Sequence, residues 1–158
     1  MKRALILFLL LSSTIVFSQK NKHAGADPWV GAFKLDLAKS KFSGPTPREE
    51  TISVAAARKD SIKYTIAGKD GNGDSYTFNY EGKADAASPE MMEGKAIAQI
   101  TYHMASSHKF TADGHGADGS TSTGAITLSD DGKTITVNQH NKTAQGAEQE
   151  ITAVYVRQ

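Results

Sequence analysis

Four histidines in the second half of the chain have the side chains best suited to hold a metal, because imidazole binds zinc, copper and iron. They are His103, His108, His115 and His140. His103 and His108 are five residues apart, so on one straight strand their side chains face opposite sides. No spacing in the set forces two imidazoles together. We therefore interpret these residues as surface histidines, and the sequence predicts neither a metal site nor a cofactor.

Nucleophilic catalysis has little support in the sequence. The chain has no cysteine and no Gly-x-Ser-x-Gly nucleophile elbow. Residues 106–108 (Ser-Ser-His) have suitable side chains, but adjacency in sequence does not create the geometry of a catalytic triad. The carboxylate pairs at 49–50 and 130–131 lie beside predicted loops or turns, and we interpret them as solvated. No arrangement of residues predicts a catalytic site.

Residues 70–81 nearly fit a calcium-binding EF-hand loop, in which oxygen ligands recur at the first, third, fifth and twelfth positions. The residues at those positions are Asp70, Asn72, Asp74 and Glu81. The sixth position, where the loop requires glycine, is Ser75. Residues 76–80 alternate like a strand, whereas an EF-hand would enter a helix there. We interpret the segment as a hairpin turn, with weak calcium binding as the alternative.

Aromatic side chains are the best indication of function. Seven of them fall at positions predicted to face the interior: Trp29, Phe33, Tyr64, Tyr76, Phe78, Tyr80 and Tyr102. Inward-facing tyrosine hydroxyls need hydrogen-bond partners, which a bound amphipathic ligand, the backbone or buried water can supply. The sequence predicts that these residues bind a ligand if the interior is hollow, and that they form a packed core if it is filled.

The elements that position these residues are strands. A period of two dominates from residue 27 onward, which is typical of strands with one apolar and one solvated face. The alternating runs lie near 29–37, 51–56, 62–67, 76–80, 98–104 and 134–138. Glycine-rich turns are predicted at 68–73, 113–119, 129–133 and 141–147. The pattern predicts an all-β fold: an antiparallel up-and-down barrel of roughly eight or nine strands.

We expect the barrel to span residues 27–158 as one domain, with its last strand (149–156) pairing near the first so that no edge stays open. A barrel of eight strands is just wide enough to be filled by side chains or to hold one small ligand. Residues 39–47 contain two prolines and predict a surface loop. In residues 83–94 alternation is absent, and Ser88 followed by Pro89 predicts a helical turn over 88–92.

The first 18 residues have the pattern of a secretory signal peptide. Lys2 and Arg3 precede an apolar run that begins at Ala4, ends at Phe17 and is followed by the small residue Ser18. The unbroken part of this run is shorter than the roughly 20 residues of a membrane-spanning helix, although an uncleaved anchor is the alternative. The sequence therefore predicts a flexible leader at 19–26, no transmembrane segment after cleavage, and export to the periplasm or the cell exterior.

Charge and composition exclude several classes of protein. Lys and Arg number 18 against 17 Asp and Glu, so the chain has no surplus of basic charge to neutralise phosphates, and we predict no nucleic-acid partner. The absence of cysteine means that an exported chain must be stable through its core alone. The hydrophobic content of 39% excludes a wholly disordered chain.

Residues 27–42 (DPWVGAFKLDLAKSKF) resemble the start of a group of small exported bacterial proteins with a lipocalin-like barrel. In that group a Gly-x-Trp-like element precedes an AKSKF loop, and here Phe33 occupies the position of the tryptophan. The strand at 131–137 (DGKTITV) and the ending at 153–155 (AVY) are similar to the group as well, whereas 84–118 are unmatched. The resemblance implies a lipocalin-like fold and export, and it implies no particular activity.

These observations favour an exported barrel that binds a small apolar or amphipathic molecule. Two alternatives remain at this point. One is a barrel enzyme or isomerase that uses a tyrosine or histidine at the barrel mouth. The other is a ligand-free structural protein or envelope-interaction protein with a filled barrel. The sequence makes no prediction of the oligomeric state.

Overall fold

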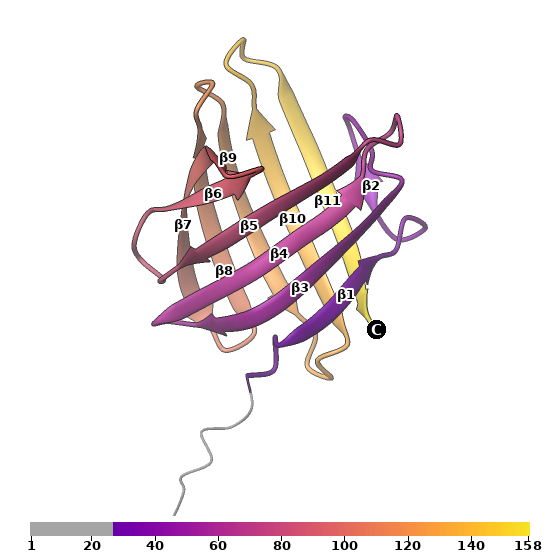
Figure 1. The fold of residues 1–158 in the computed structure, drawn as a ribbon. Helices are drawn as coiled ribbons and strands as arrows, with labels where there is room; N and C mark the ends of the chain where they lie inside the picture. The colour runs from indigo at the N-terminus through magenta and orange to yellow at the C-terminus, as the bar shows by residue number, and fades with distance from the viewer. Residues whose placement is uncertain (1–26) are drawn as a thin grey trace, which may run out of the picture.

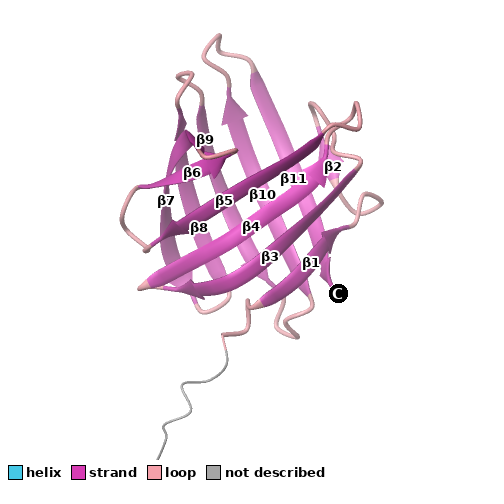
Figure 2. Ribbon diagram, in the orientation of Figure 1, coloured by secondary structure: helices cyan, strands magenta, loops and turns pink. Residues whose placement is uncertain are grey.

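The computed structural model describes residues 27–158, which form eleven strands and no helix (Figures 1 and 2). The strands are β1 (Gly31–Leu35), β2 (Lys41–Phe42), β3 (Glu49–Arg58), β4 (Ser61–Lys69), β5 (Ser75–Gly82), β6 (Ser88–Met92), β7 (Lys95–Ser106), β8 (Lys109–Gly116), β9 (Thr121–Leu128), β10 (Thr134–Lys142) and β11 (Glu148–Arg157). The predicted signal peptide (1–18) and leader (19–26) lie outside the described residues. Because the described part of the chain has no helix, it has none that could cross a membrane.

The strands form one closed antiparallel ring. From β3 to β11 each strand pairs with the next along the chain, and β1 lies between β3 and β11. On one side of β1, Phe33 is opposite Ile52 of β3, and on the other it is opposite Arg157 of β11. The predicted antiparallel up-and-down barrel is therefore confirmed, as is the pairing of the last strand with the first. The strand number is higher than the eight or nine predicted, because β1 and β3–β11 all belong to the ring.

The positions of the four predicted turns agree with the structure. The hairpins β4–β5, β8–β9, β9–β10 and β10–β11 all fall within or beside the four predicted glycine-rich segments. Gly132 and Gly146 have φ values of 68° and 86°, which suit glycine in tight hairpin turns. The β8–β9 turn begins later than predicted, because β8 continues to Gly116.

The predicted surface loop at 39–47 contains a short strand. Within it, β2 pairs with Ile151 and Thr152 of β11. Between β1 and β2 the chain stays attached to the same partner, because Asp36 N–H donates to the Val154 carbonyl at 2.8 Å and Val154 N–H donates to Ser40 Oγ at 3.0 Å. The two short strands therefore run along β11 as one strand interrupted by a turn.

The predicted helical turn at 88–92 is wrong, because these residues form β6. This strand pairs along its length with β7 but with only Phe78, Asn79 and Tyr80 of β5. Proline has no N–H group to donate to a neighbouring strand. Pro89 lies before the three residues of β6 that pair with β5, so it interrupts no hydrogen bond to β5. A bulge between Glu90 and Met91 interrupts the register with β7.

One end of the barrel is filled by side chains. The most buried large residues there include Trp29, Phe33, Phe110, Leu128 and Ile135. Trp29 packs edge-on against Phe110, with ring centroids 5.4 Å apart, and its indole N–H donates to the Ser107 carbonyl at 2.8 Å. This packing closes the end of the barrel at which the C-terminus lies (Figure 1).

Arg157 covers the filled end from outside. Its guanidinium carbon lies 4.3 Å from the centroid of the Phe33 ring, a cation–π contact. The same group donates to the carbonyls of Pro28 at 2.6 Å, Val30 at 2.7 Å and Gly132 at 2.7 Å. Arg157 thereby joins β11 to the segment before β1 and to the β9–β10 turn.

Candidate functional site

The other end of the barrel is hollow. A cavity of about 1070 Å³ is lined by inward-facing residues of β3 to β11. Its wall reaches the β8–β9 and β10–β11 turns and the loop before β3, where Pro45, Asp118 and Thr143 contribute. These turns lie at the end opposite the filled core, because successive strands of the ring alternate in direction. This volume is slightly above the range typical of ligand pockets, which is about 300–1,000 Å³.

Five of the seven predicted ligand-contacting residues lie on the wall of this cavity: Trp29, Tyr64, Tyr76, Phe78 and Tyr102. Phe33 and Tyr80 do not. Phe33 is 0% exposed and belongs to the filled end. Tyr80 is 2% exposed because neighbouring rings cover it: its ring centroid lies 5.3 Å from that of Tyr64, which it stacks on, and 5.1 Å from that of Tyr102, which it meets edge-on. Six of the rings lie on strands whose alternation turns them inward, and Trp29 lies in the turn before β1. Position along the strand decides which of the six meet the cavity.

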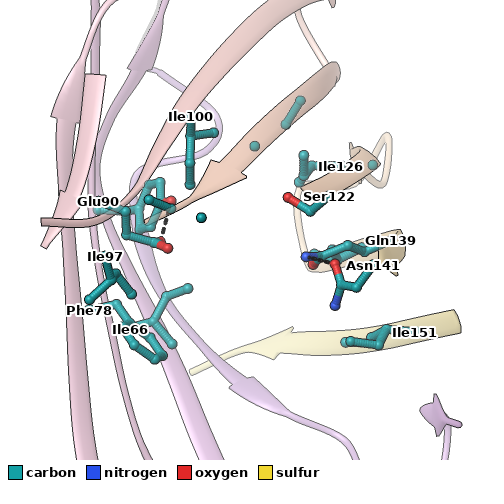
Figure 3. Close-up of a pocket in the computed structure, with 18 of the residues that line it drawn as sticks. Ile66, Phe78, Glu90, Ile97, Ile100, Ser122, Ile126, Gln139, Asn141 and Ile151 are labelled. Atoms are coloured by element: carbon teal, nitrogen blue, oxygen red, sulfur yellow. Dashed lines mark hydrogen bonds between the residues drawn. The ribbon is translucent and has the colours of Figure 1, made fainter. Parts of the chain in front are cut away.

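One side of the cavity carries a chain of hydrogen bonds that ends on a carboxylate (Figure 3). Tyr64 of β4 donates its hydroxyl hydrogen to Oε1 of Glu90 on β6 at 3.0 Å. The hydroxyls of Tyr64 and Tyr102 are 2.8 Å apart. Because the Tyr64 hydrogen is directed to Glu90, Tyr102 is the donor in this second bond. The three side chains therefore form a relay that runs from Tyr102 through Tyr64 to Glu90.

A second carboxylate, Glu50 of β3, accepts two further tyrosine hydroxyls. Tyr76 of β5 donates to its Oε2 atom at 2.5 Å, and Tyr155 of β11 donates to its Oε1 atom. Tyr155 is 5% exposed, so this bond satisfies a hydroxyl that has little access to water. Both oxygens of Glu50 are thus engaged by the protein.

The wall opposite Glu90 carries neutral polar side chains. Figure 3 shows Ser122, Gln139 and Asn141 across the cavity from Glu90, with Ile126 and Ile151 near them. The side-chain amide of Gln139 donates to Oδ1 of Asn141 at 2.7 Å. The cavity therefore has Glu90 and its tyrosines on one wall and neutral amide and hydroxyl groups on the opposite wall, with aliphatic side chains on both.

Burial changes the protonation behaviour of the relay. The pKa of Glu90 is raised above its ordinary value, first because burial disfavours the charged form; the hydrogen bond from Tyr64 opposes this, and the negative charge of Glu50 adds to it. Burial is also the largest cause of the raised pKa of Tyr64 and of Tyr102. Both hydroxyls consequently keep their hydrogens at neutral pH and act as donors.

Neither glutamate was singled out from the sequence. Residues 49–50 were interpreted as a solvated pair, which is correct only for Glu49, whose carboxylate lies 2.9 Å from Lys69 on the outer face. Glu50 has the same strand parity as Ile52, so the alternation itself contained the signal for an inward carboxylate. The inward position of Glu90 was not predicted, because its segment was predicted to be a helical turn and not a strand.

The other chemically capable residues lie away from the cavity. In the described residues none of the four histidines contributes to its wall. His103 lies 2.8 Å from Asp85 and His140 lies 2.7 Å from Glu150, and both imidazoles are partly exposed. Within residues 27–158 no group of three or more His, Asp or Glu side chains is arranged to hold a metal ion.

The segment that resembles a calcium loop is a hairpin turn between β4 and β5. Asp70 Oδ1 accepts the backbone N–H groups of Asn72, Gly73 and Asp74 at 2.8–2.9 Å. These backbone hydrogen bonds hold the pKa of Asp70 below its ordinary value. The aspartate therefore stabilises the turn from within, as side chains of this type commonly do.

Comparison with known proteins identifies the fold alone. No family model matches the sequence, and neither does any curated protein. Among solved structures, the fluorescent protein UnaG is 12% identical with a TM-score of 0.55, over 85% of this chain and 99% of that one. A Schistosoma mansoni fatty acid binding protein in complex with arachidonic acid is 10% identical with a TM-score of 0.50, over 83% and 96%.

A redesigned β-barrel, mFAP1, bound to DFHBI, is 12% identical with a TM-score of 0.50, over 83% of this chain and 96% of that one. At such identities the similarity extends to the path of the backbone and not to the residues of the cavity. The chain therefore has the closed antiparallel barrel fold of these proteins.

Proposed function

We propose that this protein is an exported barrel that binds one small apolar or amphipathic molecule in its cavity. The observation that carries the proposal is the cavity of about 1070 Å³, whose wall is aliphatic and aromatic with a few convergent polar groups. Ligand sites typically have this composition. Two barrels of the same fold are described as complexes with small molecules, arachidonic acid and DFHBI, which supports the proposal.

Titration with Nile red, a neutral hydrophobic dye, tests this function. We expect saturable binding with a limit of one dye per chain and a blue shift of its emission, because the dye leaves water for an apolar interior. The Ala98→Trp variant places a large ring on the cavity wall and should weaken dye binding roughly tenfold or more, since the added volume competes with the dye.

Ala67→Trp is the matched control, because Ala67 is exposed on the outer face of β4. It should bind the dye like the unmodified protein. The proposed function is wrong if the unmodified protein does not bind the dye, or if the two tryptophan variants weaken binding equally. If the dye binds as expected, native mass spectrometry of protein purified from its own host would identify a natural ligand by its added mass.

Export is the second part of the proposal. It is supported by Lys2 and Arg3, by the apolar run that ends at Phe17, and by the resemblance of residues 27–42 to small exported lipocalin-like proteins. We expect the mature chain to begin close to Gln19 or Lys20. Amino-terminal sequencing of protein recovered from its own host checks this, and retention of Met1 in a membrane fraction would contradict it.

Proton transfer by Glu90 is a second candidate function. A carboxyl group with a raised pKa on a cavity wall is a suitable general acid or base, and Tyr64 and Tyr102 lie beside it as donors. If the protein is an isomerase, a molecule bound in the cavity is converted to another form, and Glu90→Gln abolishes the conversion. If it is a binding protein, the same molecule is recovered unchanged.

A further inference from the structure

The charges inside the cavity are all of one sign. Glu50 and Glu90 lie on its wall below the turns, whereas the remaining charged lining residues, Lys95, Asp118 and Lys142, are exposed in or beside turns. Among the described residues, neither interior glutamate forms an ion pair with a lysine, arginine or histidine. Both glutamates are only partly exposed, and a carboxylate that is partly removed from water without a cation is costly, so a cationic ligand would reduce that cost.

The tyrosines that surround the two glutamates have no hydroxyl hydrogen left to donate to a ligand. The hydroxyl hydrogens of Tyr64, Tyr76, Tyr102 and Tyr155 are all directed to protein oxygens. The Oε1 atom of Glu90 accepts the hydrogen bond from Tyr64, and within residues 27–158 no hydrogen bond reaches its Oε2 atom. A ligand that enters here must therefore bring donors, and an ammonium group supplies three.

The rings around Glu90 also suit a cation. Tyr64, Tyr102 and Phe78 line the cavity beside it, and an ammonium group is attracted to the faces of such rings. A ligand carboxylate beside Glu90 would meet two negative charges in a medium of low dielectric constant, and the tyrosine hydroxyls there have no hydrogen left to donate to it. Donors for a carboxylate lie elsewhere on the lining: the amide groups of Gln139 and Asn141 on the facing wall, and the ammonium groups of Lys95 and Lys142 beside the turns.

We infer that the cavity selects an amphipathic amine, bound through its ammonium group at Glu90, over a carboxylate with the same apolar chain. This inference rests on the proposed function, because it names the class of molecule that the same cavity binds. It also distinguishes this barrel from the fatty acid binding protein of similar fold, whose described ligand, arachidonic acid, is a carboxylic acid.

Decylamine, 1-decanol and decanoate provide the test, because they share one alkyl chain and differ in the charge of the head group near neutral pH. We expect isothermal titration calorimetry to show decylamine binding at least tenfold more tightly than decanoate, with decanol between them. Glu90→Gln retains the shape of the side chain and an acceptor for Tyr64, but it replaces the free carboxylate oxygen with an amide. It should weaken decylamine binding about 10- to 100-fold, the usual effect of losing a hydrogen bond to a charged group.

Glu93→Gln is the matched control, because it removes the same charge from an exposed turn three residues away. It should leave decylamine affinity unchanged. The inference is overturned if decanoate binds more tightly than decylamine, or if Glu90→Gln binds decylamine as tightly as the unmodified protein does. In either case the proposed function still stands as long as Nile red binds. Failure of Nile red and all three decyl compounds to bind would overturn both.

Discussion

Replacing Trp29 with alanine is expected to lower the free energy of unfolding by about 3–5 kcal/mol, the usual cost of removing a large buried aromatic ring. Trp29 is 3% exposed and contributes both to the filled end and to the floor of the cavity. The substitution removes the edge-on contact with Phe110 and leaves the Ser107 carbonyl without its indole donor. Urea denaturation followed by far-ultraviolet circular dichroism measures the loss, since the variant has no tryptophan fluorescence.

Trp29→Phe separates the two parts of this effect. It keeps an aromatic ring against Phe110 and removes the hydrogen bond to Ser107, which is worth about 0.5–1.5 kcal/mol, together with part of the ring volume. The phenylalanine variant should therefore be clearly more stable than the alanine variant. A loss below about 1 kcal/mol for Trp29→Ala would mean that the tryptophan is not part of the core.

Phe33→Ala should have an effect of similar size, again about 3–5 kcal/mol. Phe33 is 0% exposed, and its ring supports the guanidinium group of Arg157 at 4.3 Å. Removing the ring opens a cavity in the filled end and ends the cation–π contact. Chemical denaturation again gives the loss, here with Trp29 fluorescence as the signal.

Val30→Ala is the control for Phe33, because Val30 precedes β1 and its side chain is 44% exposed. It should change stability by less than about 0.5 kcal/mol. A double-mutant cycle with Arg157→Ala then measures the Phe33–Arg157 pair directly, and we expect favourable coupling of about 0.5–1 kcal/mol. Strictly additive losses would show that the guanidinium acts only through its three carbonyl partners.

The period-two pattern was sufficient to predict the barrel, because in a strand the side chains alternate whatever their neighbours are. The interior position of Tyr64, Tyr76 and Tyr102 followed from this alternation. The depth of each ring did not follow, since depth depends on how the strands are staggered around the ring. Tyr80 is therefore covered by neighbouring rings, whereas Phe78, two residues before it on β5, lines the cavity.

The errors arose where a local rule competed with a tertiary one. Ser88 followed by Pro89 has the form of a helix start, yet pairing with β7 makes the segment a strand. Glu50 beside Glu49 resembles a solvated pair, yet two tyrosines on β5 and β11 stabilise it inside. These partners are 26 and 105 residues away, so no local pattern reveals them.

The pairing of β1 with β11 has a consequence for how the chain folds. Phe33 and Arg157 are neighbours in the ring, yet almost the whole domain separates them along the chain. Contacts of such long sequence separation are slow to form, because the entropy of closing the loop must be lost before the contact contributes. During synthesis the partly emerged chain has two unpaired strand edges, and both persist until residues 155–157 are available to β1. Closure of the ring is therefore the last pairing that the chain can make, and until then both edges are open to pairing with another chain.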